Sequence, residues 1–209
     1  TGHLGAVIAH ILLPPLVLAV VSASRSWAAS GVTALLFAVV AASAPILVPA
    51  LVVGFVAWAF ARPRGMLRVL LSLVPAAALF APLIWEQVRR GNPLALLAEP
   101  GVAVVGEVPP AYELAIGSLG GWAGWDAFLV GSPVALLSPW ALALLVAPIA
   151  VLAVLALFLP GTLRSVPAMI LALLGFLTAV LAAHLQLAVV GSQTAAVWPG
   201  TGLSLYWLG

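Results

Sequence analysis

The sequence predicts an all-α fold, a polytopic transmembrane helical bundle of about six to seven spans with a long interfacial exoplasmic loop. Two observations predict it. Hydrophobic residues make up 65% of the chain and the mean hydropathy is +1.30, which is more apolar surface than a water-soluble fold can cover with polar groups. The charged residues, seven Arg and five acids, gather in short clusters between apolar stretches of about 17–25 residues, the length that crosses a bilayer.

Residues 1–85 form the first predicted unit, with four spans at residues 4–22, 28–42, 46–60 and 67–85. Prolines mark the points where these helices should bend or end, because proline removes a backbone donor. We expect a kink or break at Pro14 and Pro15, a turn between the second and third spans at Pro45, and kinks at Pro75 and Pro82. Without the turn at Pro45, the uncharged stretch around it would be a helix of about 52 Å, too long for one span.

Residues 86–133 form a second predicted unit, an exoplasmic loop with amphipathic or re-entrant pieces, because Gly, Pro and all five acids concentrate there. The third unit, residues 134–209, holds spans at 134–159 and 166–190, a polar turn at 191–202, and a seventh span that begins at Leu203 and is truncated. Gly175 and Ala179 form a pair of small residues at the spacing that favours close helix packing. Because the chain begins with Thr1 and stops inside an apolar run, we expect it to be a piece of a longer protein.

The arginines predict the orientation of the spans. Alternation places five of them on one side of the membrane: Arg25, Arg62, Arg64, Arg68 and Arg164. Arg89, Arg90 and all acids fall on the other side. Since positive loops stay in the cytoplasm, the connection at residues 62–68 should be cytoplasmic and the long loop exoplasmic, in a multi-pass protein of a bacterial plasma membrane.

Composition and motifs exclude several classes of chemistry. The absence of Cys excludes disulfides and cysteine nucleophiles. No phosphate-binding loop, nucleophile elbow, zinc box or dinucleotide fingerprint is present, so no metal and no cofactor are predicted. The net charge of +2 comes from two excess arginines and predicts no nucleic-acid partner.

The sharpest candidate for binding is the Arg89–Arg90 pair at the end of the fourth span. Glu86 lies four residues before Arg90, so the two can pair if the helix continues. Two interpretations stay open. The arginines could bind a lipid-linked phosphate, because guanidinium suits bidentate phosphate contacts, or they could be snorkelling residues with a local ion pair.

Asp126 is a candidate catalytic residue, because it follows a Gly/Trp segment. The tryptophans could form an aromatic platform that binds a sugar, and the Asp126 carboxylate beside it could act as a base. The alternative is that Asp126 caps a turn or a helix. Glu99, Glu107 and Glu113 have a spacing that matches no metal site or carboxylate pair, which favours solvated loop acids. His10 and His184 lie inside spans, where polar side chains usually face other helices, and His184 with Gln186 could form a buried pair that joins helices.

Several short segments resemble the polytopic membrane region of large actinobacterial membrane glycosyltransferases, either of the family-2 type or of the polyprenyl-phosphosugar-dependent polytopic class. They are RSWAASG (25–31), AASAP (41–45), VP (74–75), APL (81–83), NPLALLAEPG (92–101), GSLGGWAGW (117–125) and VWPGTGLS (197–204). The resemblance implies the membrane-embedded portion of an enzyme that acts on cell-envelope glycans or lipid-linked sugars. It also implies that the catalytic residues of the parent chain lie outside this fragment, in a cytosolic domain or an earlier exoplasmic loop.

Two other classes of protein fit the sequence. A non-catalytic structural membrane subunit, bound to other membrane subunits, explains the lack of motifs. A secondary transporter would use broken helices, for which Pro14 and Pro15 offer one site, although the spans lack the buried charges of ion-coupled pumps. The expected partners are therefore the lipid bilayer, a polyprenyl-linked sugar and other membrane subunits.

Overall fold

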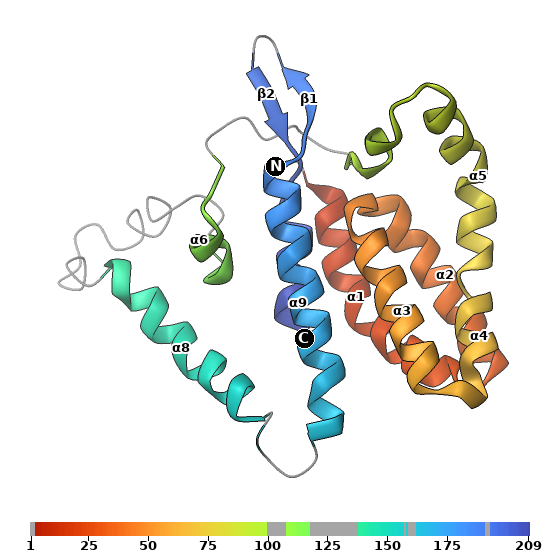
Figure 1. Cartoon of the computed structure of the whole chain (residues 1–209), viewed down its shortest axis with the longest axis horizontal. Coiled ribbons are helices and arrows are strands. Elements are labelled where there is room, and N and C mark those ends of the chain that lie inside the picture. Colours follow the sequence, from red (N-terminus) through yellow and green to blue (C-terminus); the bar gives the residue numbers. More distant parts are fainter. Residues whose placement is uncertain (1–2, 100–107, 118–137, 157, 159–161, 191–192) are drawn as a thin grey trace.

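The structure, a computed structural model, describes residues 3–99, 108–117, 138–156, 158, 162–190 and 193–209. This part of the chain is mostly helical (Figure 1). Its α-helices are α1 (Leu4–Ala23), α2 (Trp27–Ser43), α3 (Val48–Ala61), α4 (Met66–Leu71), α5 (Val74–Arg89), α6 (Ala111–Ala115), α8 (Ser138–Ala156), α9 (Thr162–His184) and α10 (Gly200–Leu208). Three 3₁₀ turns, η1 (Pro45–Leu47), η2 (Pro63–Gly65) and η3 (Pro93–Leu97), join some of them.

Two described helices are long and apolar enough to cross a membrane, at Leu4–Ala23 and Val166–His184. A third candidate is a bent pair, Pro45–Ala61 with Pro63–Leu71, whose halves meet at 114°. The outer surface agrees with such a setting, because large apolar side chains lie exposed along these helices, including Leu18 at 69% and Leu173 at 58%. The chain is therefore helical with features of a membrane protein.

Prolines act differently at different positions of the N-terminal helices. The turn at Pro45 is confirmed, since α2 ends at Ser43 and η1 begins at Pro45. We expected a kink or a break at Pro14 and Pro15, and the break is wrong, because α1 runs through both residues. Both prolines are exposed on α1, so the hydrogen bonds that they remove lie away from the packed face.

The predicted span at residues 67–85 is two helices. α4 ends at Leu71, and α5 begins at Val74 with Pro75 in its first turn, a position where the missing N–H costs nothing. Ser72 and Leu73 form the turn between them, and the Ser72 hydroxyl donates to the carbonyl of Val69. Pro82 lies inside α5 without ending it.

The C-terminal third departs from the predicted pattern. The span expected to reach residue 190 ends at His184, and the following residues form an antiparallel hairpin, β1 (Gln186–Val190) with β2 (Gln193–Ala196). The predicted polar turn at 191–202 is therefore wrong in part, because it contains β2 and the start of α10. β1 is rich in Val and Leu, which strands and apolar helices share, so composition could not distinguish them.

The core lies where α1, α2, α3 and α10 meet, and its fully buried side chains include Leu13, Leu16, Val40, Leu47 and Leu205. α1 packs on α2 and α10, and α3 packs on α9. At the start of α1, His3 stacks on Trp198 with ring centroids 4.2 Å apart. This contact joins the N-terminus of α1 to the segment that leads into α10.

α9 and α10 pack closely through small residues, which confirms the interpretation of Gly175 and Ala179. A Cβ added to Gly175 would lie 2.7 Å from the carbonyl carbon of Leu205, and one added to Gly202 would lie 2.7 Å from the Cα of Ala179. Such distances leave no room for a side chain. The two backbones therefore approach as closely as small residues permit.

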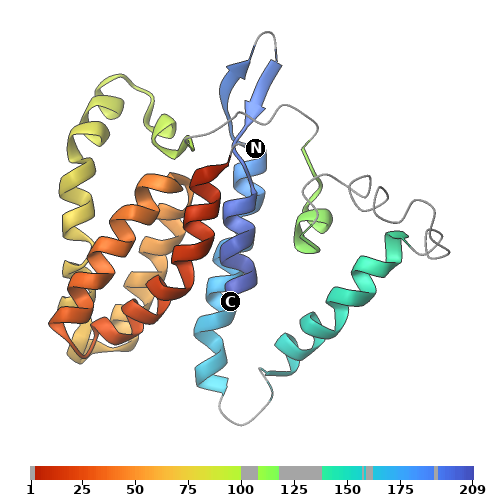
Figure 2. The same ribbon diagram turned by 180° about the vertical axis from the view of Figure 1, so that it is seen from behind.

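The turns of the bundle collect at two ends (Figures 1 and 2). The α1–α2 turn, η2 and the start of α9 lie at one end, while the end of α5, η3 and the β-hairpin lie at the other. At the first end, Arg68 lies over the ring of Trp27 and donates to the carbonyl of Ser24, and Ser30 donates to the carbonyl of Arg68. The elements that carry the arginines of residues 25–68 thus lie at the end of the bundle opposite the end of α5.

Candidate functional site

The local sequence explains why α5 ends at its arginine pair. Gly91 adopts a positive φ of 73°, and its N–H donates to the carbonyl of Val88, while the N–H of Asn92 donates to the carbonyl of Gln87. These two bonds form a Schellman motif, which satisfies carbonyls that the helix leaves free and favours Gly at this position. Pro93 then starts η3, which turns back and packs on α5 and η1.

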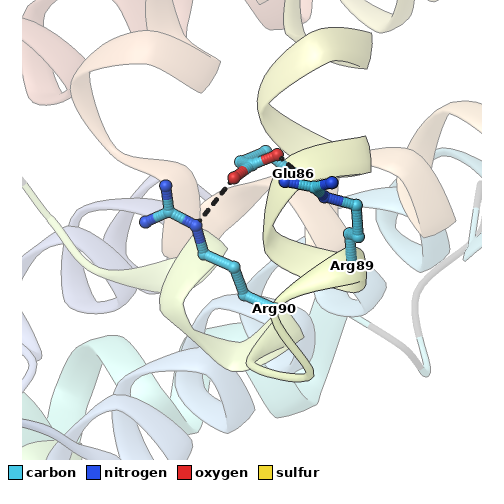
Figure 3. A network of polar contacts seen from close by, with 3 residues as sticks. All are labelled: Glu86, Arg89 and Arg90. Atoms are coloured by element: carbon cyan, nitrogen blue, oxygen red, sulfur yellow. Dashed lines mark hydrogen bonds and ion pairs between the residues drawn. The ribbon is translucent and has the colours of Figure 1, made fainter.

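Glu86 binds both arginines on the surface of α5 (Figure 3), so the predicted pairing is confirmed. Its Oε1 lies 2.9 Å from Arg90 Nε and its Oε2 lies 3.4 Å from Arg89 Nε. The two arginine side chains are 70% and 65% exposed. Exposed pairs of this kind stabilise a fold by about 1 kcal/mol at most. One carboxylate between two guanidinium groups leaves an excess positive charge, so the pair can still attract an anion.

A groove runs beside the same helix. It has a volume of about 590 Å³ and lies between α2, η1, α3, α5 and η3, a size typical of ligand sites. Its lining along α5 extends from Ala76 to Gln87, which is about 17 Å of helix. Most of its walls are Ala, Val, Leu, Pro and Phe. Exposed lining residues such as Leu83 and Ile84 show that the groove opens to the outside of the bundle.

The groove is polar at the end where η3 covers it, through the side chains of Gln87 and Glu99. Glu99 Oε1 accepts a hydrogen bond of 2.7 Å from the hydroxyl of Thr201 on α10, a residue that is fully buried. Burial raises the pKa of Glu99 from 4.5 to about 7, and the Thr201 hydrogen bond opposes this rise. Glu99 can therefore carry or release a proton near neutral pH.

The structure places the other candidate residues as follows. Asp126 and Glu107 lie outside the described residues. Glu113 is buried on α6, where the Tyr112 hydroxyl donates to it at 3.4 Å, so the expectation of a solvated acid is wrong there. Glu99 is also partly buried, and no motif could have revealed it, since its partner lies 102 positions later.

We expected His10 and His184 to face other helices, and the structure does not place them so. His10 is exposed on α1, and His184 is exposed with its Nδ1 2.8 Å from the carbonyl of Val180, one turn earlier in the same helix. Gln186 lies in β1 and is exposed. Within the described ranges no group of three or more His, Cys, Asp or Glu residues is placed to hold a metal ion.

Comparison with protein-family models, with curated proteins and with solved structures gives no match.

Proposed function

We propose that this chain is the membrane-embedded portion of a glycosyltransferase that acts on cell-envelope glycans or lipid-linked sugars in a bacterial plasma membrane. The observation that carries the proposal is the exposed Arg89–Arg90 pair at the end of an apolar helix, with Glu86 as the one acid bound to both. The sequence segments that resemble actinobacterial membrane glycosyltransferases support the same function. In this proposal the chain binds the lipid substrate, and the parent protein supplies catalytic residues from elsewhere.

The chemistry of the arginines suits a lipid phosphate. A guanidinium presents two parallel N–H groups to a phosphate and keeps its charge at any physiological pH. Both side chains turn toward Glu86 on α5 (Figure 3) and are mostly exposed, so an anion reaches them without displacing packed residues. A helix end that follows an apolar stretch lies at headgroup level in a bilayer, which is where a polyprenyl phosphate carries its charge.

A non-catalytic membrane subunit is the second candidate. The absence of a metal cluster among the described residues and the small number of buried charged groups there suit a protein that only positions a catalytic partner. A transporter is less well supported, because α1 continues through Pro14 and Pro15 and gives no broken helix there.

The first test is the double substitution Arg89→Gln/Arg90→Gln. We expect it to weaken binding of undecaprenyl phosphate by at least about tenfold, because it removes two charge-assisted contacts. Folding should be unchanged, since both side chains are exposed. Binding is measured with the purified protein in nanodiscs that contain the lipid, and folding by thermal denaturation.

The matched control is Arg25→Gln/Arg64→Gln, which removes two exposed arginines from the opposite end of the bundle. It should leave binding unchanged. Lys at positions 89 and 90 should restore binding only in part, because an ammonium group lacks the planar fork. Equal binding by the wild type and the Arg89→Gln/Arg90→Gln protein would refute the role of this pair.

We also propose that the Arg25–Arg68 end faces the cytoplasm and the Arg89–Arg90 end faces outward, in a multi-pass arrangement of about six to seven spans. The chain has no Cys, so single cysteines report sidedness directly. Arg64→Cys and Asn92→Cys introduce exposed thiols at the two ends. In intact cells, a membrane-impermeant maleimide should label position 92 and leave position 64 unlabelled. Labelling of position 64 alone would show that the orientation is the reverse of the proposed one.

A further inference from the structure

α5 stands apart from the bundle. Among its residues only Ala76 is buried, although the helix packs on α2 and η3. Neighbouring positions on the same helix, such as Ala77 and Phe80, line the groove. An apolar groove of this length suits an occupant with a long apolar part.

The ends of the groove define that occupant further. Apolar residues line the groove from Leu73 onward. The polar lining residues, Gln87 and Glu99, lie toward the end of α5. Gln87 is on the last turn of α5, directly beside the arginine pair. An occupant with one hydrocarbon chain and an anionic head matches both the apolar walls and the positive charge at the helix end.

We propose that the groove holds the part of the hydrocarbon chain next to the phosphate in the lipid whose phosphate pairs with Arg89 and Arg90, and that Glu99 is protonated when this lipid is bound. The inference rests on the proposed function. It adds the place where the lipid's hydrocarbon chain binds and a proton whose uptake is linked to binding. The occupant is a single-chain lipid phosphate ester of the polyprenyl type.

The hydrogen bonds of Glu99 support its protonation in place. A threonine hydroxyl has one hydrogen and can also accept. When Glu99 is ionised, Thr201 donates to it at 2.7 Å. When Glu99 is protonated, it can donate to Thr201, whose hydrogen then has the carbonyl of Trp198 as acceptor at 3.4 Å. Glu99 thus keeps its partner in both states and does not leave the groove when its charge changes.

Electrostatics makes the protonated state the one that accepts an anion. A carboxylate in an apolar groove repels a phosphate that arrives beside it, whereas a neutral carboxylic acid does not. The charged groups on the neighbouring α5 end are Glu86, Arg89 and Arg90, and the two arginines are already bound to Glu86. The described residues of α2, α3, η3 and α10 bring no charged group to the groove apart from Glu99 itself. The raised pKa of Glu99 agrees with this arrangement.

The first arm of the test fills the groove. Ala77→Phe places a ring on a lining residue, while Ala78→Phe places the same ring on the next residue of α5, which does not line the groove. Both positions are exposed, so both variants should fold. In nanodiscs, we expect Ala77→Phe to weaken binding of undecaprenyl-phospho-glucose by at least about tenfold and Ala78→Phe to have little effect. Free glucose 1-phosphate should not bind, because it lacks the chain.

The second arm measures the proton. Undecaprenyl-phospho-glucose is a phosphodiester and keeps one charge across the neutral range, so its own titration does not contribute. Wild-type affinity should fall by up to about tenfold for each pH unit above the pKa of Glu99 in the free protein. Glu99→Gln, which imitates the protonated acid and can still accept from Thr201, should bind tightly at every pH.

The outcomes separate this inference from the proposed function. Arginine-dependent binding that is insensitive to Ala77→Phe and flat with pH would overturn the groove and the proton while leaving the lipid-phosphate function in place. No binding of any lipid phosphate by the wild type would overturn both. Equal binding of phosphatidylglycerol and the polyprenyl ester would overturn the single-chain occupant.

Discussion

Gly175→Ala should strongly destabilise the protein. The added Cβ would meet the backbone of Leu205 and Tyr206 on α10, at 2.7 Å from the carbonyl carbon of Leu205. Backbone atoms cannot move aside as a flexible side chain can, so α10 must shift away from α9. We expect a loss of about 3 kcal/mol, at the upper end of the range for overpacked interiors. Reversible unfolding in detergent micelles measures it.

Two other glycines provide the control. Gly31 on α2 and Gly54 on α3 have nothing within 4 Å of an added Cβ. Replacing either with Ala should leave stability unchanged or raise it by up to about 1 kcal/mol, because Ala favours a helix over Gly. Opposite signs at Gly175 and Gly54 would establish close packing as the cause. If Gly175→Ala were as stable as the wild type, the α9–α10 contact would be wrong.

The sequence predicts part of this fold because some signals act locally. The turn at Pro45 follows from proline, which acts on its immediate neighbours, and it is observed. The polar connection predicted at residues 62–68 is observed only in part, because η2 is followed by α4, which begins at Met66. The continuous α1 was not predictable in the same way. Whether adjacent prolines break a helix depends on the face they occupy, and both lie on the exposed face of α1.

The β-hairpin shows a second limit. Residues 186–190 have the sequence QLAVV, an apolar run that suits the end of a transmembrane helix as well as a strand. The partner strand, Gln193–Ala196, and the contact of Val197 N–H with the carbonyl of Leu185 decide between them. These are tertiary contacts, which the hydropathy of the sequence does not predict.

The candidate site divides in the same way. The pairing of Glu86 with Arg90 follows from helical spacing and is confirmed at 2.9 Å. Glu99 carried no local signal, because its burial and its bond to Thr201 arise only when the segment after η3 meets α10. For this reason the sequence grouped Glu99 with solvated loop acids, whereas the structure makes it the ionisable residue of the groove.

Raising the pH from about 5 to about 8 should destabilise the ligand-free protein through Glu99. The pKa of this carboxyl is 4.5 in an ordinary setting and about 7 in the fold, so the folded state holds the proton more tightly than the unfolded chain does. The stabilisation is complete below pH 4.5, declines as pH rises toward 7, and is lost above it. One pKa unit corresponds to about 1.4 kcal/mol, and Glu99 is only partly buried, so the whole effect is at most about 3 kcal/mol.

Glu99→Gln isolates this effect. The amide cannot titrate, and its oxygen can still accept the hydrogen bond from Thr201, so the variant should show a smaller fall in unfolding free energy across the same pH range. The exposed acid Glu86 bound to Arg89 and Arg90 is present in both proteins and cancels in the comparison. Thr201→Val provides a second check, because removing the hydroxyl leaves the ionised form of Glu99 without its hydrogen-bond donor and should push the decline to higher pH. Parallel pH profiles for the wild type and Glu99→Gln would show that Glu99 is hydrated and ordinary, and the groove would then lack a proton that binding could use.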